Sequence, residues 1–215
     1  MSINTLLFPL GLLPSIAILY IIIRNYEGKF VEKNIFILFV VGFVFGIFIY
    51  LLERFTFFIE FTLNLLIYSF LFSLVEQLSK FIVLNLKRFY DKAITIYGAS
   101  FGLGFSSLFA TFFVIELVAG IEIIFLIILV ISVIIYHCNS GITIALGISR
   151  REKLKYFIIS FFMGMLIWAI VIIFSSYNLV SILSFALSTS IFFLLYKKYL
   201  PFEMLTRKEI LSKKS

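Results

Sequence analysis

The chain is poor in the residues that build metal centres and disulfides. It contains one cysteine, Cys138, and one histidine, His137. A lone cysteine cannot close a disulfide within the chain, and one imidazole cannot supply the two histidines of the zinc motif H-E-x-x-H. Asp91 is the only aspartate, which excludes an intramembrane protease of the two-aspartate type. We therefore expect neither a metal nor another cofactor.

Charge is scarce as well. Charged residues make up 13% of the 215 residues and hydrophobic residues 63%, whereas soluble domains are about a quarter charged and about half apolar. A compact soluble fold of this size could not hide so much apolar surface from water. No segment of about 10 residues alternates between polar and apolar residues, as the strands of a membrane barrel would. The sequence predicts an all-α fold, a polytopic transmembrane helix bundle.

Seven apolar segments are long enough for a membrane span, which takes about 20 residues. They are expected near residues 5–23, 35–52, 58–86, 93–116, 121–148, 156–175 and 178–196. Turn or interface signals separate them, among them Glu53-Arg54 before the third segment and Lys87-Arg88 after it. This pattern predicts a single transmembrane domain, residues 1–198, followed by a polar cytoplasmic tail, residues 199–215.

The basic residues are concentrated at one end of the predicted bundle. Of the 18 lysines and arginines, all but Arg54 and Lys80 lie after the first, third, fifth or seventh segment. Positively charged loops stay in the cytoplasm, so we expect the amino terminus outside and the tail inside. The net charge of +7 then attracts membrane lipids, and no nucleic-acid partner is expected. The expected location is the plasma membrane of a prokaryote.

Three ionisable residues, Glu76, Lys80 and His137, fall deep inside predicted spans, where a charge costs at least a few kcal/mol. Glu76 precedes Lys87, and His137 precedes Arg150, by a similar number of residues. At about 1.5 Å per residue, Glu76 and His137 lie ~16 and ~20 Å from the inner boundary. A carboxylate and an imidazole at similar depth could activate a water molecule. We expect the two groups to lie within about 3–6 Å, or one water molecule, of each other.

Polar residues accompany Glu76 on one face of the third segment. Glu76 and Lys80 stand at i and i+4 with the acid first, the favourable order, and Ser69, Ser73 and Gln77 lie on the same stripe. The alternative reading is a neutralised Glu76–Lys80 pair that only packs helices together.

The fifth and fourth segments carry the other candidate residues. Ser140 accompanies His137, which could also be no more than a hydrogen-bonded bridge between helices. In the fourth segment, small residues at helical spacing predict a close approach of a neighbouring helix. The core-packing residues expected there are Tyr97, Gly98, Gly102, Gly104 and Phe105.

In their order, these motifs resemble the PrsW family of intramembrane proteases, which is related to CAAX prenyl endopeptidases and Abi-type membrane proteins. The family pattern is E-E-x-x-K, then Y-G-x-x-x-G-L-G-F-A-x-x-E-N, then a histidine in a later span. The resemblance covers residues 75–147 and lies in Glu76-Gln77-Leu78-Ser79-Lys80, in Tyr97-Gly98 through Gly104-Phe105, and in His137.

The resemblance implies an intramembrane peptidase of glutamate type. Glu76 would be the general base on water, His137 would orient that water or stabilise the oxyanion, and Lys80 would tune the local charge. Gln77 and Ser140 would support them. The implied substrate is a membrane-associated segment of a protein, such as a single-span membrane protein.

The first and second motifs both depart from the family pattern. Gln77 replaces the second glutamate, and Phe109-Ala110 replace the glutamate–asparagine pair. The chain could therefore be a catalytically inactive relative that binds another transmembrane protein. A transporter or channel is a further alternative, because buried Glu, Lys and His can relay protons. A serine hydrolase built on Ser100 or Ser106 with His137 fits least, because neither serine stands in the motif G-x-S-G.

Overall fold

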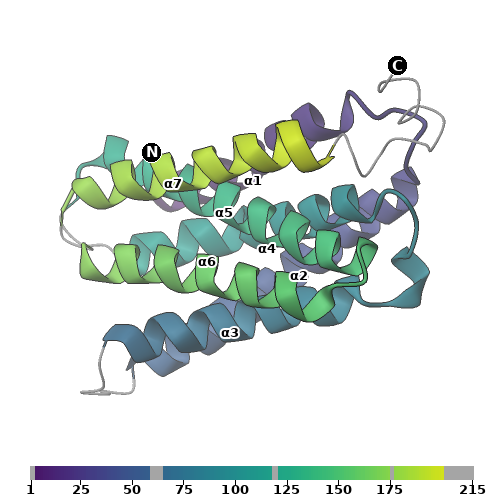
Figure 1. The fold of residues 1–215 in the computed structure, drawn as a ribbon. Helices are drawn as coiled ribbons and strands as arrows, with labels where there is room; N and C mark the ends of the chain where they lie inside the picture. The colour runs from purple at the N-terminus through teal and green to yellow at the C-terminus, as the bar shows by residue number, and fades with distance from the viewer. Residues whose placement is uncertain (1–2, 59–64, 118–120, 175–176, 201–215) are drawn as a thin grey trace.

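The protein is built from helices. The computed structural model describes residues 3–58, 65–117, 121–174 and 177–200, and no strand occurs in these ranges. The helices are α1 (Ile3–Ile23), α2 (Glu32–Phe58), α3 (Leu65–Leu84), α4 (Ile94–Leu117), α5 (Ile123–Ser149), α6 (Lys153–Ile173) and α7 (Leu179–Leu194). A 3₁₀ turn, Lys87–Phe89, follows α3, and a π-helical stretch, Leu195–Tyr199, continues α7. The prediction of an all-α fold is confirmed (Figure 1).

Six helices, α2 to α7, are long and apolar enough to cross a membrane, α7 together with its π-helical stretch. The fold is therefore that of an integral membrane protein. In α1, the described apolar part is the shorter segment Pro9–Ile23. The seventh span and the orientation stay predictions. The expected tail, residues 199–215, falls almost wholly outside the described residues, which end at residue 200.

The second and third helices differ from the expected spans. The sequence predicts a boundary at Glu53-Arg54, but α2 continues through both residues to Phe58, and α3 begins only at Leu65. Glu53 is fully buried in the bundle, and the Arg54 guanidinium lies 3.3 Å from the carboxylate of Glu116 on α4. Charges that pack inside the bundle or pair with a neighbouring helix do not require the helix to end.

Helix α4 lies at the centre of the bundle. Residues 94–111 are all buried, and the helix packs against α1, α2 and α5. Helix α5 in turn contacts α6 and α7, while α3 packs mainly against α6 (Figure 1). The helix that carries Glu76 is therefore held chiefly by α6.

Glycines allow the backbones of α4 and α5 to touch. A Cβ atom on Gly102 would overlap the carbonyl oxygen of His137, and Cβ atoms on Gly98 and Gly141 would each overlap the other residue's carbonyl oxygen. On the opposite face of α4, a Cβ atom on Gly104 would overlap the backbone of α2. The glycines of the fourth segment thus make the close approach predicted for them, and they fix the height of His137 beside α4.

Replacing Gly102 by alanine is expected to push α4 and α5 apart, because the added methyl group overlaps the backbone at His137. Overpacking of this kind costs about 1–3 kcal/mol, so the midpoint of thermal unfolding in detergent should fall. Ser190→Thr is the control, since it adds one methyl group at an exposed position of α7. Equal midpoints for the two variants would contradict the close contact between α4 and α5.

Candidate active site

Polar side chains from three helices gather inside the bundle. Helix α3 supplies Glu76, Gln77 and Lys80, α5 supplies Tyr136, His137 and Ser140, and α6 supplies Ser160 and Trp168. Each of them is fully buried. We refer to these residues as the buried polar cluster.

The structure brings Glu76 and His137 together. Oε1 of Glu76 lies 3.8 Å from Nε2 of His137, within the range expected from their similar depth. This distance is too long for a direct hydrogen bond. The two groups are close enough for one water molecule to contact both.

Two donors hold the carboxylate of Glu76. The hydroxyl of Tyr136 donates to Oε2 at 3.0 Å, and the indole N–H of Trp168 donates to Oε1 at 3.1 Å. Both side chains are rigid and packed, so the carboxylate has a fixed orientation towards His137. Neither Tyr136 nor Trp168 is among the site residues predicted from the sequence. One general rule could have pointed to Trp168 from the sequence: a buried indole N–H usually finds a hydrogen-bond acceptor.

The alternative interpretation of the polar stripe on α3 requires a Glu76–Lys80 ion pair, and Lys80 forms no direct one. Its Nζ donates to Oγ of Ser140 at 2.7 Å and to Oε1 of Gln77 at 3.4 Å, and no carboxylate oxygen of Glu76 lies within 4.0 Å. The ammonium also lies over the ring of Phe105, 5.1 Å from its centroid, where a cation–π attraction stabilises it. The two side chains reach towards different neighbours, so Lys80 and Glu76 do not contact each other.

Gln77 connects the three helices. Its Oε1 accepts from Ser160 at 2.8 Å, and its Nε2 donates to the hydroxyl of Tyr136 at 2.7 Å. Because Gln77 supplies the proton of that bond, the Tyr136 hydroxyl keeps its own proton for the hydrogen bond to Glu76. A glutamate at position 77, as in the PrsW pattern, could not donate to Tyr136 when ionised. The amide that departs from the family pattern thus suits this hydrogen-bond chain.

The ring of His137 has aromatic neighbours but no hydrogen-bond partner within the described residues. It packs against Phe105, Phe109 and Tyr136, with centroids 4.8, 5.1 and 4.7 Å away. Buried polar atoms are nearly always hydrogen-bonded, and an exception calls for an explanation. A histidine that only bridges helices would use its ring nitrogens in hydrogen bonds, and neither nitrogen of His137 is bonded to a described residue. Phe109, which stands where the family pattern has a glutamate, contributes apolar surface to this site.

A second buried acid lies near the cluster and was missed from the sequence. Glu53 of α2 is fully buried, and Glu76 and Lys80 are the ionisable groups near it. In the sequence it stands beside Arg54 and resembles an interface residue, and nothing in the pattern shows which way its side chain points. Its burial adds a second carboxyl group to the surroundings of a single lysine.

The remaining candidates lie elsewhere. Ser100 donates to the carbonyl of Ile35, and Ser106 to carbonyls of its own helix, so neither hydroxyl is bonded to His137. Asn139 faces α7, where it donates to the carbonyl of Ser188. In the described ranges, no three His, Cys, Asp or Glu side chains lie close enough together to hold a metal ion.

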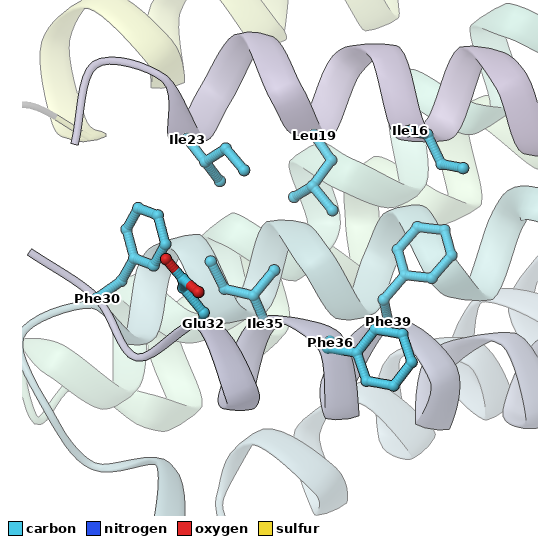
Figure 2. A pocket seen from close by; sticks show the side chains of 8 residues that line it. All are labelled: Ile16, Leu19, Ile23, Phe30, Glu32, Ile35, Phe36 and Phe39. Atoms are coloured by element: carbon cyan, nitrogen blue, oxygen red, sulfur yellow. The ribbon is translucent and has the colours of Figure 1, made fainter. Parts of the chain in front are cut away.

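At two surface hollows, the described lining residues include none of the buried polar cluster. One, of about 300 Å³, lies between α1 and α2 (Figure 2). Its lining is apolar except for one carboxylate: Ile16, Leu19, Ile23, Phe30, Glu32, Ile35, Phe36 and Phe39. It has no pair of groups that could carry out acid–base chemistry. The other lies at the basic end of the bundle and is polar.

Comparisons with known proteins identify no relative of this chain. No family model matches the chain, and no curated protein or solved structure matches it. The similarity to the PrsW family therefore rests on the motif residues within 75–147. The geometry of the buried polar cluster indicates what this chain can do.

Proposed function

We propose that the protein is an intramembrane peptidase of glutamate type that hydrolyses a membrane-associated segment of another protein. The observation that carries the proposal is the pair formed by Glu76 and His137. A carboxylate fixed by two donors lies 3.8 Å from a buried imidazole whose nitrogens are bonded to no described residue. Hydrolysis of an amide needs such a base and such a polar group beside one water molecule.

The proposed reaction uses one water molecule held between the two groups. The carboxylate of Glu76 takes a proton from the water as its oxygen attacks the amide carbon. His137 hydrogen-bonds to the water or to the oxyanion that forms. Glu76 then passes the proton to the amide nitrogen as the C–N bond breaks, which gives a carboxylic acid and an amine. Tyr136 and Trp168 keep the carboxylate aimed at the reacting atoms.

The proposed substrate is a single-span membrane protein. The cluster lies within helices that can cross a membrane and is closed to solvent on every side. A peptide segment would reach it only after helices separate. Helix α3 is suited to such a movement, because it packs mainly against α6, whereas α4 is held by three helices.

A catalytically inactive protein that binds another transmembrane helix is the second candidate. Phe109 favours it, because an aromatic ring against His137 occupies the position of an acid in the PrsW pattern. The complete burial of the cluster is also compatible with a purely structural network.

Cleavage of single-span membrane proteins by the purified protein in lipid discs is the expected activity. Glu76→Gln and His137→Gln should each lower the rate by about 100-fold or more, since proton transfer by a positioned group contributes about 10²–10⁴-fold. Glu116→Gln is the control, because this glutamate is exposed at the end of α4. Equal rates in all four proteins would sink the peptidase proposal. Binding without cleavage, unchanged by Glu76→Gln, would establish the second candidate.

We also propose seven spans with the amino terminus outside, in the plasma membrane of a prokaryote. The support is the charge distribution: the loops after α1, α3 and α5 carry lysine and arginine, and positive loops stay inside. The resemblance to the PrsW family, whose motif pattern is bacterial, supports the plasma membrane of a prokaryote as the location.

Cysteine labelling on intact cells tests this orientation. The native Cys138 is buried and should stay unlabelled. A membrane-impermeant maleimide should label Glu122→Cys, at the outer start of α5, and should label Lys33→Cys only after the cells are opened. Both positions are exposed in the folded protein. The opposite labelling pattern would reverse the proposed topology.

A further inference from the structure

The polar hollow at the basic end of the bundle has a volume of about 600 Å³, within the range of small-molecule sites. Two segments far apart in the sequence line it. The loop between α3 and α4 supplies Tyr90, Asp91 and Lys92. The other segment supplies Ser149 at the end of α5, Arg151 of the following turn and Lys153 at the start of α6. None of these residues belongs to the buried polar cluster.

The charge in this hollow is positive. Asp91 is the only acid among the described residues that line it, and both of its carboxylate oxygens already accept hydrogen bonds. The backbone N–H of Ala93 donates to one at 2.7 Å, and the hydroxyl of Tyr97 donates to the other at 2.8 Å. Among the described residues, no carboxylate pairs with Lys92 or Arg151.

Lys153 is held in place at the edge of the hollow. Its Nζ donates to Oδ1 of Asn85 at 2.6 Å and to the hydroxyl of Tyr90 at 2.9 Å. These bonds tie the turn after α5 to the end of α3. An ammonium has three protons, so one remains for a ligand.

Arg151 occupies a backbone position that favours glycine. Helix α5 ends in a Schellman motif, in which Glu152 N–H donates to the carbonyl of Gly147 and Arg151 N–H to that of Ile148. The residue between the helix and Glu152 must be left-handed, and Arg151 has φ 59°. Glycine takes this conformation without strain, whereas arginine does not. An arginine at this position is thus kept at a cost in stability, and its side chain lies at the hollow.

We propose that this hollow binds a phosphate group, carried either by an anionic lipid headgroup or by a soluble phosphate. Arginine presents a planar pair of donors that fits phosphate oxygens, and lysine adds point charge. The hydroxyl of Tyr90 contacts Lys153, and Ser149 also lines the hollow. Basic pockets at the cytoplasmic ends of membrane helices recognise lipid headgroups in this way. This site is independent of the proposed peptidase activity.

Thermal unfolding of the full-length protein in detergent tests the proposal, because a ligand that binds only the folded state raises the midpoint. The probes are dioctanoyl phosphatidic acid, dioctanoyl phosphatidylcholine and inorganic phosphate at constant ionic strength. Phosphatidic acid should raise the midpoint saturably and phosphatidylcholine should not. In the double variant Lys92→Gln/Arg151→Gly, the ligand concentration at half-saturation should rise about tenfold or more, since charge-assisted hydrogen bonds are lost.

Without ligand, the single variant Arg151→Gly should unfold at the same temperature as the wild type or at a higher one.

The control variant Lys33→Gln/Lys155→Gln removes two charges at the same end of the bundle but outside the hollow. It should keep the wild-type half-saturation. Stabilisation by phosphatidic acid alone assigns the site to a lipid headgroup, and equal stabilisation by inorganic phosphate assigns it to a soluble phosphate. The proposal is overturned if no probe acts saturably, or if the control variant loses as much affinity as the variant of the hollow.

Discussion

The burial of a carboxylate and an ammonium inside a membrane-spanning bundle is the constraint on which the rest of the structure depends. Glu76 and Lys80 are both without solvent exposure, and buried charged groups are tolerated only where hydrogen bonds replace water. The bonds that satisfy them come from Tyr136 and Ser140 of α5 and from Trp168 of α6. The chemistry of α3 therefore determines which faces of α5 and α6 turn inwards.

Close backbone contact between α4 and α5 provides the frame for this cluster. The backbone of His137 lies against Gly102, so its ring is fixed in height and direction, with Phe105 and Phe109 around it. Glycine–backbone contacts leave no room for the helices to slide past each other. The result is an imidazole held beside Glu76 with its nitrogens bonded to no residue that the structure describes. A rigid support with an unused polar group is what a site for water and substrate requires.

Depth in the membrane could be predicted from the sequence, and rotation about the helix axes could not. A rise of about 1.5 Å per residue and a fixed membrane thickness place Glu76 and His137 at one level, and they meet. The contributions of Ser160 and Trp168 depend on how α6 is rotated, and an almost uniformly apolar helix carries no pattern that determines its rotation. Glu53 was assigned to a helix end because a charge beside an arginine is typical of an interface. Only the packing of α2 shows that its side chain is buried.

The most direct test of this account is the fluorescence of Trp168, the only tryptophan of the chain. Its indole N–H donates to Glu76, and loss of that bond moves indole emission to shorter wavelength. Glu76→Met removes the acceptor with little change in volume, and Glu116→Met is the control at an exposed position. The account predicts a shift to shorter wavelength in Glu76→Met and none in the control. Identical emission in the wild type and both variants would contradict the buried hydrogen bond between α3 and α6.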